Sequence, residues 1–83
     1  MKILYFARIR RIVGRGSDDI TVPETVKTVG ELMDFLSAGD ESLAAAFADR
    51  RTIKAAINQS HVAHDAALAG AREVAFFPPV TGG

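Results

Sequence analysis

The chain contains no cysteine in its 83 residues, which excludes disulfide bonds, thiolate metal sites and thiol nucleophiles. It also carries no excess of either charge, since ten Lys and Arg residues balance ten Asp and Glu residues. A nucleic-acid-binding protein with a strongly basic surface is therefore not expected. No apolar run approaches the ~20 residues that cross a membrane, and no signal-peptide pattern opens the chain. These absences leave a cytoplasmic globular domain, with neither a membrane nor a nucleic acid as its partner.

The small size of the chain limits what it can enclose. Its composition, 48% hydrophobic and 24% charged, is that of a folded protein. A chain of this length buries only a bit over ~60% of the surface that its unfolded form exposes. We therefore expect one core and one sheet, with little room for an active site walled by the chain's own atoms.

The hydrophobic patterns indicate strands on both sides of one principal helix. Strands are predicted over 2–8, 20–22, 53–58 and 73–77, and a short edge strand is predicted to begin at Val62. Between the first two strands we expect a short helix over 8–13, ended by Gly14, and then a turn over 17–19. This order predicts an α+β fold of the β-grasp or ubiquitin-like kind, with a mixed sheet packed on the principal helix and short additional helices.

The principal helix is predicted over 28–37, where Thr28 and Glu31 form a capping box. An apolar stripe at helical spacing follows, and we interpret it as core rather than as a partner-binding surface: Val29, Leu32, Met33 and Leu36. A second short helix is predicted over 42–49, with Ser42 as its N-cap.

The charges are unevenly distributed along the chain. Residues 1–16 contain five basic side chains and no acid, whereas residues 17–49 contain eight acids and one base. We interpret the arginines at 8, 10, 11 and 15 as a protein-facing patch, because the interleaved aromatics typical of nucleic-acid binding are missing.

The two histidines, His61 and His64, are spaced H-x-x-H. A metal site needs three or four ligands, and Asp65 supplies only one more. Because this segment is predicted as a turn and an edge strand, we expect exposed histidines and no metal site.

The last ten residues, 74–83, carry no charged side chain. Pro78 and Pro79 must end the last strand and stiffen the chain beyond it. Gly82 and Gly83 have no side chains and can enter a slot too narrow for a Cβ atom. We therefore predict a domain over 1–77 and an extended tail over 78–83, reaching at most ~20 Å. Pro78, Pro79, Val80, Thr81 and Gly82 are predicted to insert into another protein's pocket and to deliver the carboxylate of Gly83.

The tail from Glu73 to Gly83 (EVAFFPPVTGG) resembles that of the small subunit of molybdopterin synthase, the MoaD family of ubiquitin-like sulfur carriers. The segments 4–7 (LYFA) and 55–59 (AAINQ) are also similar to that family. The sequence departs from the family pattern at Arg11, at His61 and at Gly70-Ala71-Arg72.

The resemblance implies a function for the terminus. An E1-like enzyme would adenylate the Gly83 carboxylate with ATP, and sulfur would then displace AMP to form a thiocarboxylate. The large subunit, in a heterotetramer with two small subunits, would receive this sulfur for cyclic pyranopterin monophosphate. The chain itself would bind no cofactor or metal, and its partners would supply the catalytic side chains. Partner contacts are predicted at Phe6, Phe77, Arg10 and Arg11.

Two other functions remain open. The first is a ubiquitin-like sulfur carrier or protein modifier of another pathway, such as thiamine synthesis, tRNA thiolation or isopeptide tagging. Ubiquitin-like proteins of these other pathways also end in Gly-Gly, but the shorter thiamine carriers seldom have the Phe-Phe-Pro-Pro-Val arm. The second is an interaction module with a mobile tail. A large-subunit gene beside this one would favour molybdopterin synthesis.

Overall fold

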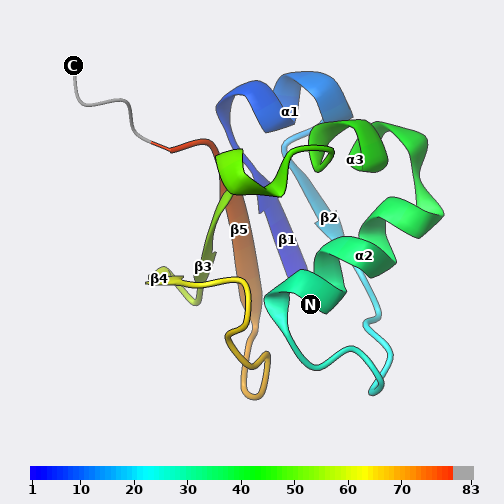
Figure 1. The fold of residues 1–83 in the computed structure, drawn as a ribbon. Coiled ribbons are helices and arrows are strands. Elements are labelled where there is room, and N and C mark those ends of the chain that lie inside the picture. The colour runs from blue at the N-terminus through cyan, green and yellow to red at the C-terminus, as the bar shows by residue number, and fades with distance from the viewer. Residues whose placement is uncertain (80–83) are drawn as a thin grey trace.

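The computed structural model describes residues 1–79, which form a mixed sheet and its covering helices (Figure 1). In chain order the elements are β1 (Lys2–Tyr5), α1 (Ala7–Val13), β2 (Ser17–Asp19), α2 (Val29–Gly39), α3 (Glu41–Ala46), the 3₁₀ helix η1 (Arg50–Thr52), β3 (Lys54–Ile57), β4 (Ser60–Val62) and β5 (Glu73–Phe77). The sheet has the strand order β2-β1-β5-β3-β4. β1 and β5 run parallel, and the other neighbours run antiparallel. The predicted α+β, β-grasp class is confirmed.

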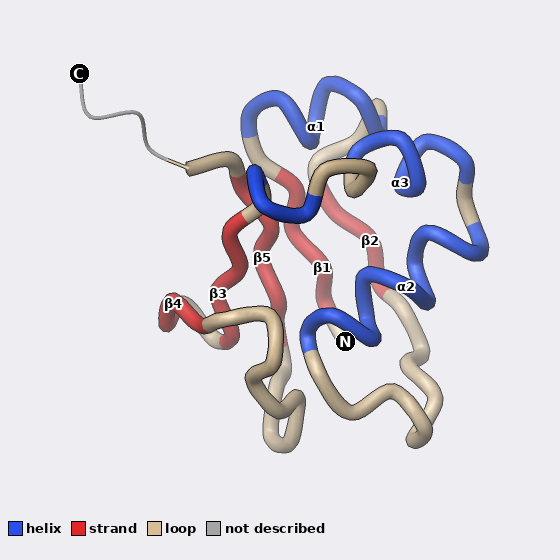
Figure 2. The backbone as a smooth tube through the Cα atoms, viewed as in Figure 1, coloured by secondary structure: helices blue, strands red, loops and turns tan. Residues whose placement is uncertain are grey.

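The helices gather on one face of the sheet and close the core there (Figure 2). The predicted stripe of α2 is buried in full: Val29, Leu32, Met33 and Leu36. Successive side chains of a strand point to opposite faces, so every second strand residue packs against this stripe. These residues are Ile3, Tyr5, Ala55, Val74 and Phe76. The rings of Phe47 and Phe76 pack with their centroids 4.9 Å apart and tilted by 59°.

The predicted boundaries of α2 and α1 follow from local chemistry. At the start of α2, the Glu31 amide donates to the Thr28 hydroxyl at 3.2 Å, and the Thr28 amide donates to the Glu31 carboxylate at 3.1 Å. This is the expected capping box. At the end of α1, Gly14 adopts a left-handed conformation with φ of 84°, as the sequence predicts for a helix-ending glycine.

The hydrophobic pattern predicts the second strand over residues 20–22, and this prediction is wrong. The residues expected to form a turn, Ser17–Asp19, are β2, and 20–22 form no strand. Ser17 lies opposite Leu4 and Asp18 opposite Ile3. These polar residues have low strand propensity, but Asp18 receives hydrogen bonds from Tyr5 and Arg15, and these tertiary contacts override it.

Further boundaries differ from expectation. The edge strand β4 ends at Val62 rather than beginning there, because Asn58 and Gln59, with φ of 47° and 72°, already turn the chain. α3 ends at Ala46 rather than at residue 49.

β1 ends at Tyr5 rather than at residue 8, since Ala7 has a φ of 51° and turns the chain into α1. The N-cap of α3 is Asp40 rather than Ser42. The Asp40 carboxylate accepts from the Ser42 amide at 2.8 Å, and a charged acceptor caps a helix more strongly than a hydroxyl.

A polar cluster joins β1, β2 and the start of α3. The Tyr5 hydroxyl donates to Asp18 at 2.8 Å, and Arg15 donates to Asp18 at 2.8 Å and to Asp40 at 3.0 Å. Burial and the hydrogen bond to Asp18 raise the pKa of Tyr5. The hydrogen bond from Arg15 lowers the pKa of Asp18, and hydrogen bonds from Ser42 and Arg15 lower the pKa of Asp40 to about 2.

The first prediction concerns the acceptor of the buried tyrosine. Asp18→Ala leaves the Tyr5 hydroxyl, in a residue only 1% exposed, without its partner. We expect a loss of about 1–3 kcal/mol in the free energy of unfolding, measured by urea denaturation. Adding Tyr5→Phe should recover part of this loss, because the second change removes the orphaned hydroxyl. Equal stability of Asp18→Ala and the wild type would contradict the role of the cluster.

The second prediction is a loss of stability in acid. Asp18 and Asp40 have folded-state pKa values below their usual value of 3.8, so their contribution is complete above about pH 4. It is lost as the pH falls from about 4 toward 2, because protonation then favours the unfolded chain. Thermal unfolding between pH 5 and pH 2 should show a steeper decline in the wild type than in Asp18→Asn/Asp40→Asn. Parallel declines would mean that other groups control acid stability.

Candidate functional site

The root of the tail is held in the middle of the sheet. β5 lies between β1 and β3, and its last residue, Phe77, is opposite Lys54 of β3. On the other side, the Phe6 amide donates to the Phe76 carbonyl at 3.1 Å. The chain leaves the sheet at the end where α1 begins and η1 lies (Figure 1). Hydrogen bonds from both neighbours therefore fix the point from which the tail projects.

The first two tail residues follow the predicted pattern. β5 ends at Phe77, and Pro78 and Pro79 form no regular structure. Pro78 is half-buried and Pro79 is exposed. The remaining residues of the predicted insertion, Val80, Thr81, Gly82 and Gly83, lie outside the described part of the chain. Their roles, and the division into a domain over 1–77 and a tail over 78–83, stay predictions.

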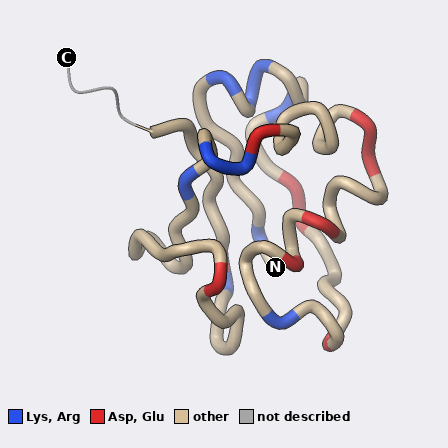
Figure 3. Tube along the Cα trace, in the orientation of Figure 1, with Lys and Arg blue, Asp and Glu red and all other residues tan. Residues whose placement is uncertain are grey.

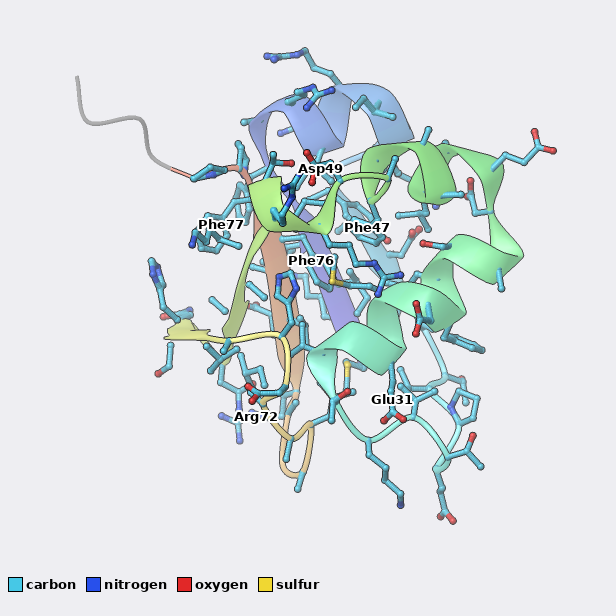
Figure 4. All side chains as sticks on the ribbon, in the orientation of Figure 1. Glu31, Phe47, Asp49, Arg72, Phe76 and Phe77 are labelled. Atoms are coloured by element: carbon cyan, nitrogen blue, oxygen red, sulfur yellow. The ribbon has the colours of Figure 1, made fainter. Side chains whose placement is uncertain are left out.

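The sheet face opposite the helices carries an apolar patch beside this root. The alternation that points Val74 and Phe76 into the core places Ala75 and Phe77 on the opposite face (Figure 4). Leu4, His61 and Phe77 form the accessible part of this patch, and Ala56 and Ala75 lie buried between them. The rings of His61 and Phe77 lie with their centroids 5.1 Å apart. Of these residues sequence reasoning named only Phe77 as a contact, although the two-residue period of each strand could have revealed the others.

Phe6 is placed at the same end of the molecule. It is the N-cap of α1 and has an extended backbone, with φ of −122° and ψ of 154°. Its side chain remains 47% exposed, which is unusual for a phenylalanine in so small a domain. Phe6 and Phe77 therefore flank the tail root as surface aromatics, the residue type that often anchors protein interfaces.

The two arginines predicted to contact partners, Arg10 and Arg11, lie on the last turn of α1 and are exposed. The guanidinium of Arg10 packs over Gly16, where an added Cβ atom would lie 3.4 Å from it. Arg10 thus lies over the turn from α1 to β2. Arg15, from the same sequence cluster, is engaged by Asp18 and Asp40.

The histidines do not converge on a common point. His61 packs on Phe77, whereas the Nε2 atom of His64 lies 2.8 Å from the Ile53 carbonyl oxygen. Within residues 1–79 no group of three or more His, Cys, Asp or Glu side chains is arranged to hold a metal ion. Over the same residues, no helix has the length and apolar character needed to span a membrane.

The mixed sheet with its covering helices places the chain in the class of ubiquitin-like, β-grasp proteins. The model of the ThiS family matches residues 3–83, and the chain belongs to this family. Molybdopterin synthase sulfur carrier subunits are similar along the whole chain. That of Escherichia coli is 41% identical over 83 residues, covering 100% of this chain and 99% of the relative. That of Haemophilus influenzae is 31% identical with the same coverage.

Solved structures agree with this assignment. SAMP1 from Haloferax volcanii superposes with a TM-score of 0.72 at 26% identity, covering 99% of this chain and 97% of the other. A putative molybdopterin converting factor, subunit 1, from Pyrococcus furiosus superposes with a TM-score of 0.73 at 27% identity, covering 95% of each chain. The resemblance read from the tail and strands is thus confirmed at the level of the family and the fold.

The third prediction compares two adjacent phenylalanines that point to opposite faces. Phe76 is fully buried against Phe47, and Phe76→Ala should cost about 3–5 kcal/mol in the free energy of unfolding. Phe77 is half-buried on the open face, and Phe77→Ala should cost clearly less. Urea denaturation of the two variants measures the difference. Equal losses would contradict the assignment of Phe77 to a docking surface.

Proposed function

We propose that this chain is the sulfur carrier subunit of a molybdopterin synthase and carries sulfur as a thiocarboxylate on Gly83. The observation that supports this most strongly is the full-length similarity to sulfur carrier subunits, together with a central strand that runs directly into the Pro78-Pro79 arm. In this proposal the sulfur goes to cyclic pyranopterin monophosphate, bound by the large subunit, in the cytoplasm.

The chemistry requires that the terminal carboxylate first be activated. A carboxylate is a poor electrophile because its oxygen is a poor leaving group. Attack of this oxygen on the α-phosphorus of ATP, with release of pyrophosphate, turns it into an acyl adenylate. The terminal sulfur of a persulfide on a relay protein then attacks the carbonyl carbon, and AMP departs to leave an acyl disulfide. A second thiol of the relay attacks the sulfur of that S–S bond that belongs to the relay, which forms a disulfide on the relay and releases the thiocarboxylate. ATP belongs to the activating enzyme in this scheme, and the chain needs no cofactor of its own.

In this proposal the carrier contributes a docking surface and an extended tail, and it contributes no catalytic side chains. Its docking surface would be the open sheet face around Phe77, together with Phe6, Arg10 and Arg11. The same surface would meet two proteins in turn, the E1-like adenylating enzyme and the large synthase subunit, with two carriers in a heterotetramer. Enzymatic activity would thus belong to the assembled synthase, in which this chain is the sulfur donor.

A second function is favoured by one observation. SAMP1 shares the fold at a TM-score of 0.72, and ubiquitin-like proteins that end in Gly-Gly include protein modifiers and the carriers of other pathways. A modifier would form an isopeptide bond between Gly83 and a lysine of a target protein. Sulfur transfer and isopeptide formation both begin with adenylation, so they are distinguished by the product that forms after it.

The fourth prediction tests the terminus directly. After incubation with the activating enzyme, ATP and a sulfur source, the intact mass should rise by the difference between one sulfur and one oxygen atom. The variant lacking Gly83 should show no gain, yet its melting temperature should match that of the wild type, because β5 ends at Phe77. An unchanged wild-type mass, under conditions that charge a related carrier, would overturn the proposal. Covalent adducts with other proteins would favour the modifier.

A further inference from the structure

A groove opens beside the tail root, where the edge of the sheet is incomplete. The edge strand β4 pairs only with residues 55–57 of β3. Lys54, the first residue of β3, therefore lies opposite Phe77 of β5 on one side and has no β4 residue opposite it on the other. Two cavities occupy this place, one of about 310 Å³ toward η1 and one of about 400 Å³ toward Phe77. They adjoin, because Lys54, Val62 and Ala63 line both.

The groove has an apolar floor and a cationic rim. Its accessible apolar floor is formed by Val62, Ala63 and Phe77, above the buried Ile53 and Ala55. Its rim carries Arg50, Arg51 and Lys54, and both histidines of the chain also line it. Among the described residues, no Asp or Glu lines either cavity. Figure 3 shows the basic segments of η1 and β3 on this side, with Asp49 directly before η1 and further acids on β2, on α2 and at the start of α3.

The three cations of the rim are not equally available. Arg50 donates to the Gly30 carbonyl at 3.1 Å and pairs with Asp34, so it ties η1 to α2. Arg51 pairs with Asp49 at 3.3 Å, but its side chain is 92% exposed, and such pairs are weak in water. Lys54 forms no salt bridge within residues 1–79. Lys54 and Arg51 therefore remain open to an external carboxylate.

We propose that this groove binds an acidic segment of the large synthase subunit, whose carboxylates meet Lys54 and Arg51 while its apolar side chains cover the floor. This inference rests on the proposed function, because it assumes that the tail enters that subunit. Complementary charge around an apolar centre steers association and sets orientation. Since Lys54 lies opposite Phe77, a segment held here sets the direction in which Pro78 and Pro79 leave the sheet.

A protein segment fits the groove better than a nucleic acid does. Nucleic-acid grooves combine cations with several exposed aromatic rings on which bases stack. Here the floor is mostly aliphatic, and the aromatic ring of Phe77 is already packed against His61. The net charge of zero also removes the general attraction to a polyanion.

The test reverses the charge of the rim and compares a matched control. Arg51→Glu/Lys54→Glu changes the groove, whereas Lys2→Glu/Arg72→Glu makes the same change in net charge around a separate cavity. Both are made in the full chain, and circular dichroism checks that they fold. Affinity for the purified large subunit is measured by calorimetry at low and at high salt. We expect about tenfold weaker binding and a flatter salt dependence for the groove variant, and less than a twofold change for the control.

A second measurement locates the contact. The chain has three lysines, Lys2, Lys27 and Lys54, and a zero-length carbodiimide reagent joins a lysine only to a carboxylate in direct contact. In the complex, Lys54 should be the lysine linked to an Asp or Glu peptide of the large subunit, identified by mass spectrometry. Links only through Lys2 or Lys27 would overturn the proposal.

The outcomes separate this inference from the function on which it rests. If both double variants lose the same affinity for the large subunit, or if neither loses any, the proposed groove is rejected and sulfur transfer is not affected. A wild-type chain that acquires sulfur but does not bind the large subunit would overturn both this groove and that synthase as the recipient. Tight binding of a single-stranded oligonucleotide that is lost in Arg51→Glu/Lys54→Glu would assign the groove to nucleic acid instead.

Discussion

The parallel pairing of β1 with β5 is the constraint on which the rest of the molecule depends. It places the first and last strands side by side in the centre of the sheet, with Lys2 opposite Glu73 and Tyr5 opposite Phe76. All other elements must then connect these two strands, and α2 closes the core on one face while doing so. Because the strands are parallel, the chain leaves β5 at the end where β1 passes into α1. Phe6 and the tail root are therefore neighbours by topology.

Because successive side chains of β5 point to opposite faces, its residues fall into two sets with different surroundings. Val74 and Phe76 face the helices and stabilise the fold, whereas Ala75 and Phe77 face outward beside the tail. A shift of the register by one residue would exchange these roles. Hydrogen bonds to strands on both sides make such a shift costly. The strand can thus continue into the tail without loosening the core, because the outward-facing Ala75 and Phe77 are not the residues that pack against the helices.

Features set by nearby residues could be predicted from the sequence, and features set by distant ones could not. The capping box of Thr28 and Glu31 and the ending of α1 at Gly14 depend on neighbours within one helical turn, and both were predicted. The strand at Ser17–Asp19 depends on Tyr5 and Arg15, and the pattern of residues 20–22 pointed elsewhere. The tail could be singled out in the sequence because it lies in one uninterrupted segment, and its chemistry stays a prediction. The groove could not be found in this way, since it combines η1, β3, β4 and the end of β5.

The distribution of charge over the surface is another feature that the composition alone does not predict. A net charge of zero argues against a general polyanion-binding surface, but it says nothing about where the charges lie. In the folded chain, α1, η1 and the start of β3 present cations near the tail, with Asp49 among them, while further acids lie on β2, on α2 and at the start of α3 (Figure 3). A domain polarised in this way is oriented by the field of a partner before contact. If the terminus is the reactive group, as we propose for this chain without cysteine, such orientation would turn the tail root rather than another face toward the partner.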